Sequence, residues 1–113
     1  MIKHTYERIG ETLWEETLEN GLRVFVFPKP EFGKSYAFFA TCYGGMDTRF
    51  LLDGQWLDTP MGIAHYLEHK MFDTPDGGNA LQKLSATGAS PNAFTSSAIT
   101  GYHFECTDLF WEN

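Results

Sequence analysis

The chain has few basic residues and no long apolar run, and each shortage excludes a class of protein. Eight Lys and Arg stand against fifteen Asp and Glu among 113 residues, which gives a formal net charge of -7. Nucleic-acid binding relies on clustered Lys and Arg that contact phosphates, so we expect no nucleic-acid partner. No apolar run approaches the roughly 20 residues that a membrane-spanning helix needs, so we expect no membrane partner either.

Cysteine and targeting signals are also scarce. The first residues lack the apolar stretch of a secretory signal, which predicts a cytoplasmic protein. Cys42 and Cys106 lie far apart in apolar, strand-like stretches, which favours two buried free thiols over a disulfide or a metal pair.

There is no internal repeat, no Gly-rich phosphate loop and no Ser or Cys nucleophile signature. The composition, 42% hydrophobic and 20% charged, is that of a folded protein.

One stretch, residues 60–72 with the sequence PMGIAHYLEHKMF, carries His65, Glu68 and His69 in the spacing H-x-x-E-H. Helical periodicity puts these three side chains within an arc of about 100°. Four apolar residues fall on the other side of the same helical wheel and form its predicted buried face: Ile63, Ala64, Leu67 and Met71. The stretch therefore predicts an amphipathic helix with one core face and one polar face.

The ends of this helix have sequence signals as well. Thr59 is a candidate N-cap, and Pro60 suits the first helical position, where its missing N–H is not needed. The turn residues of the run 74–78, TPDGG, end the helix.

Two neutral imidazoles one helical turn apart can bind a single zinc ion. A carboxylate between them is placed to take a proton from a metal-activated water, and this is the inverted form of the zincin motif. A chance cluster on a solvated helix face is the alternative. The capped, amphipathic helix favours the reading of His65 and His69 as ligands and Glu68 as general base.

The segments before this helix read mainly as strands. Residues 14–18 and 22–27 flank Asn20 and Gly21, which predicts a hairpin with a type I′ turn. Residues 1–12 are polar and predict an irregular or edge segment. Residues 35–43 are apolar on both faces, as in a central strand. A connection over residues 46–58 follows, and we expect its Phe50 and Trp56 to pack beneath that strand.

After the helix, Asn79 can cap a second helix over residues 80–87, with Gly88 at its C-terminal end. The apolar period then changes to two, which predicts strands over residues 92–97 and 100–106. Asp108 resembles the N-cap of a further helix that begins at Leu109. Because the chain ends at Asn113, this pattern predicts a truncated helix and a truncated domain.

Three stretches in a fixed order give the chain a family resemblance. They are residues 18–24 (LENGLRV), residues 62–69 (GIAHYLEH) and residues 88–95 (GASPNAFT), the last followed by Thr100 and Tyr102. Over residues 16–113 the chain resembles the N-terminal part of the insulinase and pitrilysin family of zinc peptidases, and particularly its bacterial members.

The resemblance implies an α+β fold, with helices packed on one face of a mainly antiparallel sheet. Residues 1–113 would be the N-terminal part of one catalytic metallopeptidase domain, one of several similar domains that enclose a peptide-binding chamber. His65 and His69 would bind Zn²⁺, and Glu68 would be the general base. Four residues would lie on an edge strand that pairs with the main chain of a peptide substrate: Asn92, Ala93, Phe94 and Thr95.

The resemblance also implies parts that this chain lacks. The family's third zinc ligand is a Glu on a later helix, which we expect beyond Asn113. His103 and Glu105 are possible substitutes, although surface positions on a strand suit both better. We therefore expect the fragment to be inactive alone, with a second copy or a second family subunit completing the chamber.

Three functions compete for this sequence. The first is a zinc endopeptidase that hydrolyses peptides. The second is a non-catalytic peptide-binding or partner subunit of the same family, which has no need of the base that Glu68 provides. The third is a small zinc-stabilised structural domain, which requires four protein ligands that no Cys-rich spacing supplies. The retained Glu68 favours the endopeptidase.

Overall fold

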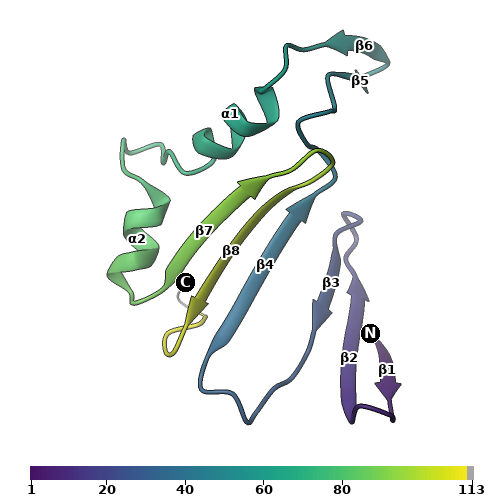
Figure 1. The fold of residues 1–113 in the computed structure, drawn as a ribbon, viewed down its shortest axis with the longest axis vertical. Helices are drawn as coiled ribbons and strands as arrows, with labels where there is room; N and C mark the ends of the chain where they lie inside the picture. The colour runs from purple at the N-terminus through teal and green to yellow at the C-terminus, as the bar shows by residue number, and fades with distance from the viewer. Residues whose placement is uncertain (112–113) are drawn as a thin grey trace. The chain divides into compact units, whose positions relative to one another are not determined.

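The computed structural model describes residues 1–111, which divide into two compact units: Met1–Gly33, and the part that begins at Lys34. The first unit is an antiparallel sheet of three strands in the order β1-β2-β3 (Figure 1). These strands are β1 (Ile2–Tyr6), β2 (Glu11–Thr17) and β3 (Arg23–Val26). The polar N-terminal segment is thus an edge strand, as one of the two sequence-based alternatives predicts.

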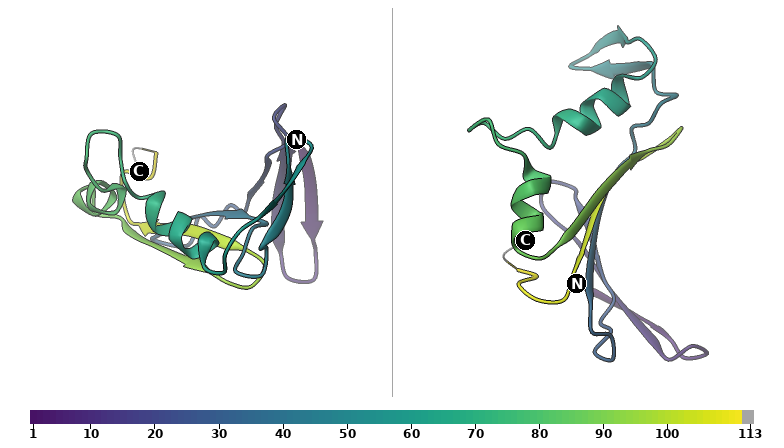
Figure 2. Two further views of the ribbon diagram at one scale, coloured as in Figure 1. Left: turned by 90° about the horizontal axis from the view of Figure 1, so that it is seen from above. Right: turned by 60° about the vertical axis from the view of Figure 1, so that its left-hand side comes forward.

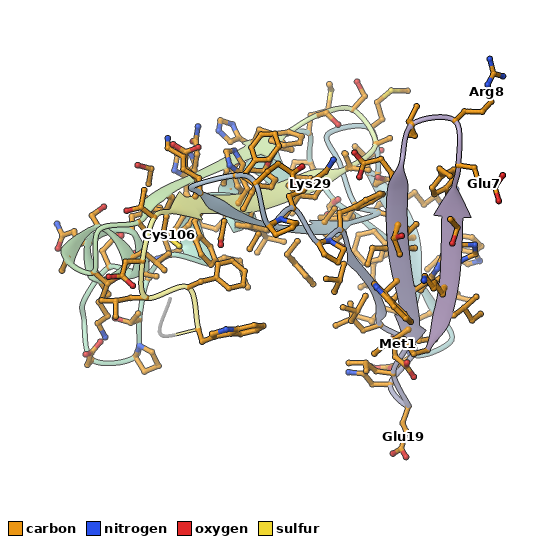
Figure 3. All side chains as sticks on the ribbon, turned by 90° about the horizontal axis from the view of Figure 1, so that it is seen from below. Met1, Glu7, Arg8, Glu19, Lys29 and Cys106 are labelled. Carbon is orange, nitrogen blue, oxygen red and sulfur yellow. The ribbon has the colours of Figure 1, made fainter. Side chains whose placement is uncertain are left out.

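The turns of this first unit point charged side chains into solvent. Glu7 and Arg8 project from the β1–β2 turn, and Glu19 projects from the β2–β3 turn (Figure 3). The hairpin at Asn20 and Gly21 forms as predicted, but its turn type was predicted wrongly. Only Gly21 of the pair has a positive φ, 85°, whereas a type I′ turn needs it at both central residues.

The second unit is built on a sheet in the order β4-β8-β7, accompanied by the hairpin β5-β6 and two helices (Figure 1). Its strands are β4 (Ser35–Thr41), β5 (Arg49–Leu52), β6 (Gln55–Asp58), β7 (Ser90–Thr95) and β8 (Thr100–Cys106). Its helices are α1 (Ile63–Lys70) and α2 (Ala80–Ala86), and both pack against β7 (Figure 2). The predicted α+β fold with a mainly antiparallel sheet is confirmed.

Strand β8 is the central strand of this sheet. It pairs with β4 on one side and with β7 on the other. Among the described strands β4 therefore lies at an edge of the sheet. The prediction of a central strand over residues 35–43 is wrong for the described sheet. Alternate residues of β8 face opposite sides of the sheet. Thr100 and Tyr102 share one side, while the His103 ring lies beside the Phe38 ring on the other, with ring centroids 6.4 Å apart.

The segment between β4 and α1 is a hairpin rather than the predicted connection. Asp53 and Gly54 both adopt positive φ, 50° and 77°, as a type I′ turn requires. Phe50 packs edge-on against Tyr43 with centroids 5.6 Å apart. Trp56 is 62% exposed, so the prediction that it packs beneath the strand is wrong.

Helix α1 starts later than predicted. The N–H of Thr59 donates to the carbonyl of Thr48 at 2.7 Å, which extends the β5–β6 ladder and keeps Thr59 in the hairpin, ahead of the helix. Gly62 is the N-cap instead, with φ 91° and no side-chain cap bond. The helix therefore begins at Ile63, three residues beyond Pro60.

The buried face of α1 also differs from the prediction. Ala64 and Glu68 are the buried residues of this helix, whereas Leu67 and Met71 are 45% and 67% exposed. The helix thus turns a carboxylate toward the sheet. Among the described helices none is long and apolar enough to cross a membrane.

Helix α2 matches its prediction closely. The side chain of Asn79 accepts a hydrogen bond from the N–H of Leu81 at 2.8 Å and caps the helix. Gly88 follows the helix with φ 84°, which is the left-handed conformation usual at this position.

Two smaller predictions fail at least in part. Both cysteines are free, but only Cys106 is buried and Cys42 is exposed. Asp108 accepts from the N–H of Leu109, the very next residue, and Leu109 has φ 54°, so no helix begins there. Residues 112 and 113, which the predicted helix would include, lie outside the described part of the chain.

Candidate metal and catalytic site

Helix α1 brings two imidazoles together. The spacing of four residues places His65 and His69 one turn apart on the same side of the helix. Their Nε2 atoms are 3.0 Å apart and their ring centroids 4.7 Å apart. Both residues are exposed, so the pair is open to a ligand from solution.

The separation of the two nitrogens fits a shared zinc ion. Zinc binds histidine nitrogen at about 2.0–2.1 Å in tetrahedral geometry, which puts two such nitrogens about 3.3 Å apart. The observed 3.0 Å between Nε2 of His65 and Nε2 of His69 is close to that value. Within residues 1–111 no group of three or more His, Cys, Asp or Glu side chains could hold a metal ion. The described residues therefore offer two ligands.

The carboxylate of Glu68 lies on the inner side of the same helix. The residue is 6% exposed, and its Oε2 accepts a hydrogen bond of 2.6 Å from the Thr95 hydroxyl on β7. Burial, and then the negative charge of Glu68, raise the pKa of the Tyr102 hydroxyl. The carboxylate is thus held between α1 and the sheet, close to the histidine pair.

All three residues of the H-x-x-E-H motif line one cavity of about 390 Å³. The strand residues Asn92, Ala93, Phe94 and Thr95 line it as well. Phe72 and Leu81 supply apolar wall. The structure therefore brings the three motif residues and the four strand residues together around a space open to a ligand.

The strand that borders this cavity has a free edge. β7 pairs with β8 on one side, and no described strand pairs with its other side. Pro91, near the start of β7, has no N–H, and such a residue is tolerated at a sheet edge. Beyond it, alternate residues of the segment 92–95 direct main-chain groups to this edge, and the Ala93 N–H donates to the Asn92 side-chain oxygen at 2.9 Å.

The two substitute ligands weighed from the sequence lie elsewhere. The His103 ring lies tilted beside the Tyr36 ring, with ring centroids 5.5 Å apart. Glu105 accepts a hydrogen bond of 2.7 Å from the Lys34 ammonium. Neither residue lines the cavity that holds the histidine pair.

Sequence reasoning missed several residues of the site. Phe72 follows His65 by seven residues and His69 by three, a helical spacing that could have identified it as a neighbour. Met46 and Met61 line a second cavity of about 500 Å³, which also reaches His65 and Thr95. Met46 comes from a loop that carries no periodic signal, and Met61 precedes the observed start of α1, so their place near the site depends on tertiary structure.

Comparison with known proteins gives several relatives, although no family model matches the chain. The chain is 49% identical over 104 residues to the protein named "Uncharacterized zinc protease YmfH" of Bacillus subtilis, and the match covers 90% of the chain and 24% of that protein. It is 33% identical over 115 residues to insulin-degrading enzyme-like 2 of Arabidopsis thaliana, covering 97% of the chain and 10% of that protein.

A solved structure shares the fold. The crystal structure described as an M16-like peptidase from Alicyclobacillus acidocaldarius superposes with a TM-score of 0.81 at 41% identity. The match covers 88% of this chain and 23% of the other. The chain thus spans about a quarter, or less, of the length of these relatives.

Proposed function

We propose that this chain, which its relatives link to the insulinase/M16 peptidases, forms the metal-binding part of a zinc-dependent endopeptidase. The observation that carries the proposal is the convergence of His65, Glu68 and His69 on one cavity beside a free strand edge. The names of the relatives, which include a zinc protease and an M16-like peptidase, support the same reaction class.

His65 and His69 would hold the zinc ion through their Nε2 atoms, which lie 3.0 Å apart. Zinc in such a site supplies Lewis acidity, which lowers the pKa of water and polarises a peptide carbonyl. A third ligand would have to come from outside residues 1–111, because no third candidate stands beside the pair in that range. We propose that a longer polypeptide, a second copy or a second subunit supplies it and completes the chamber.

Glu68 would act as the general base. Glu68 lies between the two histidines in the sequence and lines the same cavity. An ionised carboxylate can take a proton from the attacking water. General-base catalysis by a positioned side chain contributes about 10²- to 10⁴-fold to a rate. The same group can return that proton to the leaving amine, which completes the hydrolysis of the peptide bond.

Residues 92–95 would bind the substrate as an added strand. An extended peptide that pairs with the free edge of β7 is held by main-chain hydrogen bonds, which do not depend on its sequence. The apolar wall formed by Phe72 and Leu81 can accept an apolar side chain of that peptide. The substrate class that we propose is therefore extended peptides of varied sequence.

The test compares substitutions in the full-length protein. We expect Glu68→Gln to lose peptide hydrolysis while retaining zinc, because glutamine keeps the size of the side chain but cannot accept the proton. We expect His65→Ala and His69→Ala to lose both zinc and hydrolysis. Glu105→Gln is the matched control, since this residue lies outside the cavity and should keep both properties.

Metal content and cleavage of a quenched peptide are measured on the same preparations. Wild-type turnover by Glu68→Gln would refute the role of Glu68. A wild-type protein that binds peptides without cleaving them would instead support the alternative of a non-catalytic partner subunit.

A further inference from the structure

Glu68 is held by one well-defined contact from the strand opposite. The Thr95 hydroxyl lies 2.6 Å from Oε2 of Glu68. Charge-assisted O–H···O⁻ bonds have lengths of about 2.5–2.7 Å, and this bond falls in that range. Glu68 is 6% exposed, so few water molecules can compete for this oxygen. The bond joins the last turn of α1 to the end of β7.

A second threonine lies beside that bond. The Thr100 hydroxyl lies 2.8 Å from the carbonyl oxygen of Tyr43 and 3.5 Å from the Thr95 hydroxyl. A carbonyl can only accept, and each hydroxyl has a single proton. The Thr100 proton is therefore directed at Tyr43, while the Thr95 proton is directed at Glu68.

This arrangement makes the two carboxylate oxygens of Glu68 unequal. Oε2 is occupied by the Thr95 proton. Within residues 1–111, Thr95 is the side chain that donates to this carboxylate, and no hydrogen bond to Oε1 is found there. Because Glu68 lines the cavity beside His65 and His69, Oε1 is the oxygen available to a reacting group.

We infer that Thr95 is a positioning residue for the proton transfer carried out by Glu68. Its hydroxyl holds the carboxylate in one orientation, occupies Oε2 and leaves Oε1 to accept the proton. Thr100, 2% exposed, lies beside Thr95 with its own proton directed at Tyr43. This role rests on the proposed peptidase function, and it adds to Thr95 a side-chain task that is separate from main-chain pairing with a substrate.

The first test needs no activity. Crystal structures of the metal-free full-length protein are compared for the wild type and for Thr95→Val, which replaces the hydroxyl by a methyl group of similar size. We expect the Glu68 carboxylate to occupy a single orientation in the wild type and to shift or split in the variant. An unchanged carboxylate orientation in Thr95→Val would overturn the positioning role.

The second test separates kcat from KM. In the full-length protein we expect Thr95→Val to lower kcat by about 10- to 100-fold, with little change in KM and in zinc content, because a misplaced base slows the chemical step. Thr95→Ser restores the hydroxyl and should stay within a few-fold of the wild type. Ser90→Ala, which removes an exposed hydroxyl at the other end of β7, is the matched control and should behave as the wild type.

The outcomes distinguish this inference from the proposed function. Loss of activity in Glu68→Gln together with wild-type kcat in Thr95→Val would overturn the role of Thr95 alone. A Thr95→Ser variant as slow as Thr95→Val would also overturn it, because the hydroxyl would then not be the group that matters, and this comparison holds even if valine disturbs the fold. Wild-type turnover in Glu68→Gln would overturn the proposed function and the role of Thr95 with it.

Discussion

The Nε2 atoms of His65 and His69 lie 3.0 Å apart on successive turns of α1. Two imidazoles leave half of a tetrahedral zinc shell to water, so the 113-residue chain should bind zinc weakly. His65→Ala or His69→Ala should reduce binding to background, whereas His4→Ala, which changes a histidine paired with Glu15, should not. Equilibrium dialysis at neutral pH measures this. Stoichiometric zinc that survives prolonged chelation would show that another residue completes the site.

A prediction for Gly44 concerns the loop beside the site. A Cβ added there would lie 2.5 Å from the backbone nitrogen of Ala98 and 2.6 Å from the carbonyl of Ser97. Because these are backbone atoms, Gly44→Ala should lower the free energy of unfolding by about 1–3 kcal/mol. Gly33→Ala, where no atom lies within 4 Å, is the control and should change it by less than about 0.5 kcal/mol. Urea denaturation of both variants gives the comparison, and equal stabilities would contradict the close approach.

The Asn79 cap should stabilise α2, the helix that contributes Leu81 to the cavity wall. Its side chain caps α2 through the N–H of Leu81, and Leu81 is a wall residue of the cavity. Asn79→Ala should cost about 1 kcal/mol of stability, whereas Asn79→Asp retains a cap acceptor and should cost little. Thermal unfolding followed by circular dichroism measures both. An alanine variant as stable as the aspartate variant would mean that the cap contributes nothing.

Asp76 gives a prediction about pH. The Thr74 hydroxyl, the Lys83 ammonium and the Gly78 N–H all donate to its carboxylate and hold the pKa of Asp76 well below its ordinary value. A lowered folded-state pKa adds stability that is fully present above the unfolded-state value of about 3.9 and is lost as the pH falls below it.

Asp76→Asn should therefore be less stable than the wild type between about pH 5 and 7. The difference should shrink as the pH falls below about 3.9. Melting temperatures measured across this range provide the test, with Asp108→Asn as a control outside the 74–78 turn. A stability difference between the wild type and Asp76→Asn that grows toward acid pH would contradict a lowered pKa of Asp76.

Local signals in the sequence were sufficient for part of the fold. The Asn79 side chain and Gly88 mark the two ends of α2 because capping is a matter of a few neighbouring residues. The hairpin at Asn20 and Gly21 is local in the same sense. Asp53 and Gly54 carry an equally strong hairpin signal, so β5 and β6 could have been predicted from the sequence and were overlooked.

Tertiary contacts decided what the sequence could not. Thr59 and Pro60 are good helix-start residues, but the bond from Thr59 to Thr48 keeps that segment in the hairpin and moves the helix start to Ile63. A helical wheel places Glu68 on a polar face, yet the Thr95 hydroxyl satisfies its carboxylate and allows burial. The zinc ligation, the base role and the cytoplasmic location remain predictions.

Pro91 limits how the free edge of β7 can be used by other chains. A bare strand edge is a template for uncontrolled pairing between protein copies, which leads to aggregation. Pro91 has no N–H to offer along that edge, so an incoming strand finds main-chain donors only over the residues that follow it, where the Ala93 N–H already donates to the Asn92 side-chain oxygen. A short extended peptide can be accommodated in that length, whereas a long strand from a second copy would meet the proline ring. The edge can thus stay open for binding while resisting indefinite growth of the sheet.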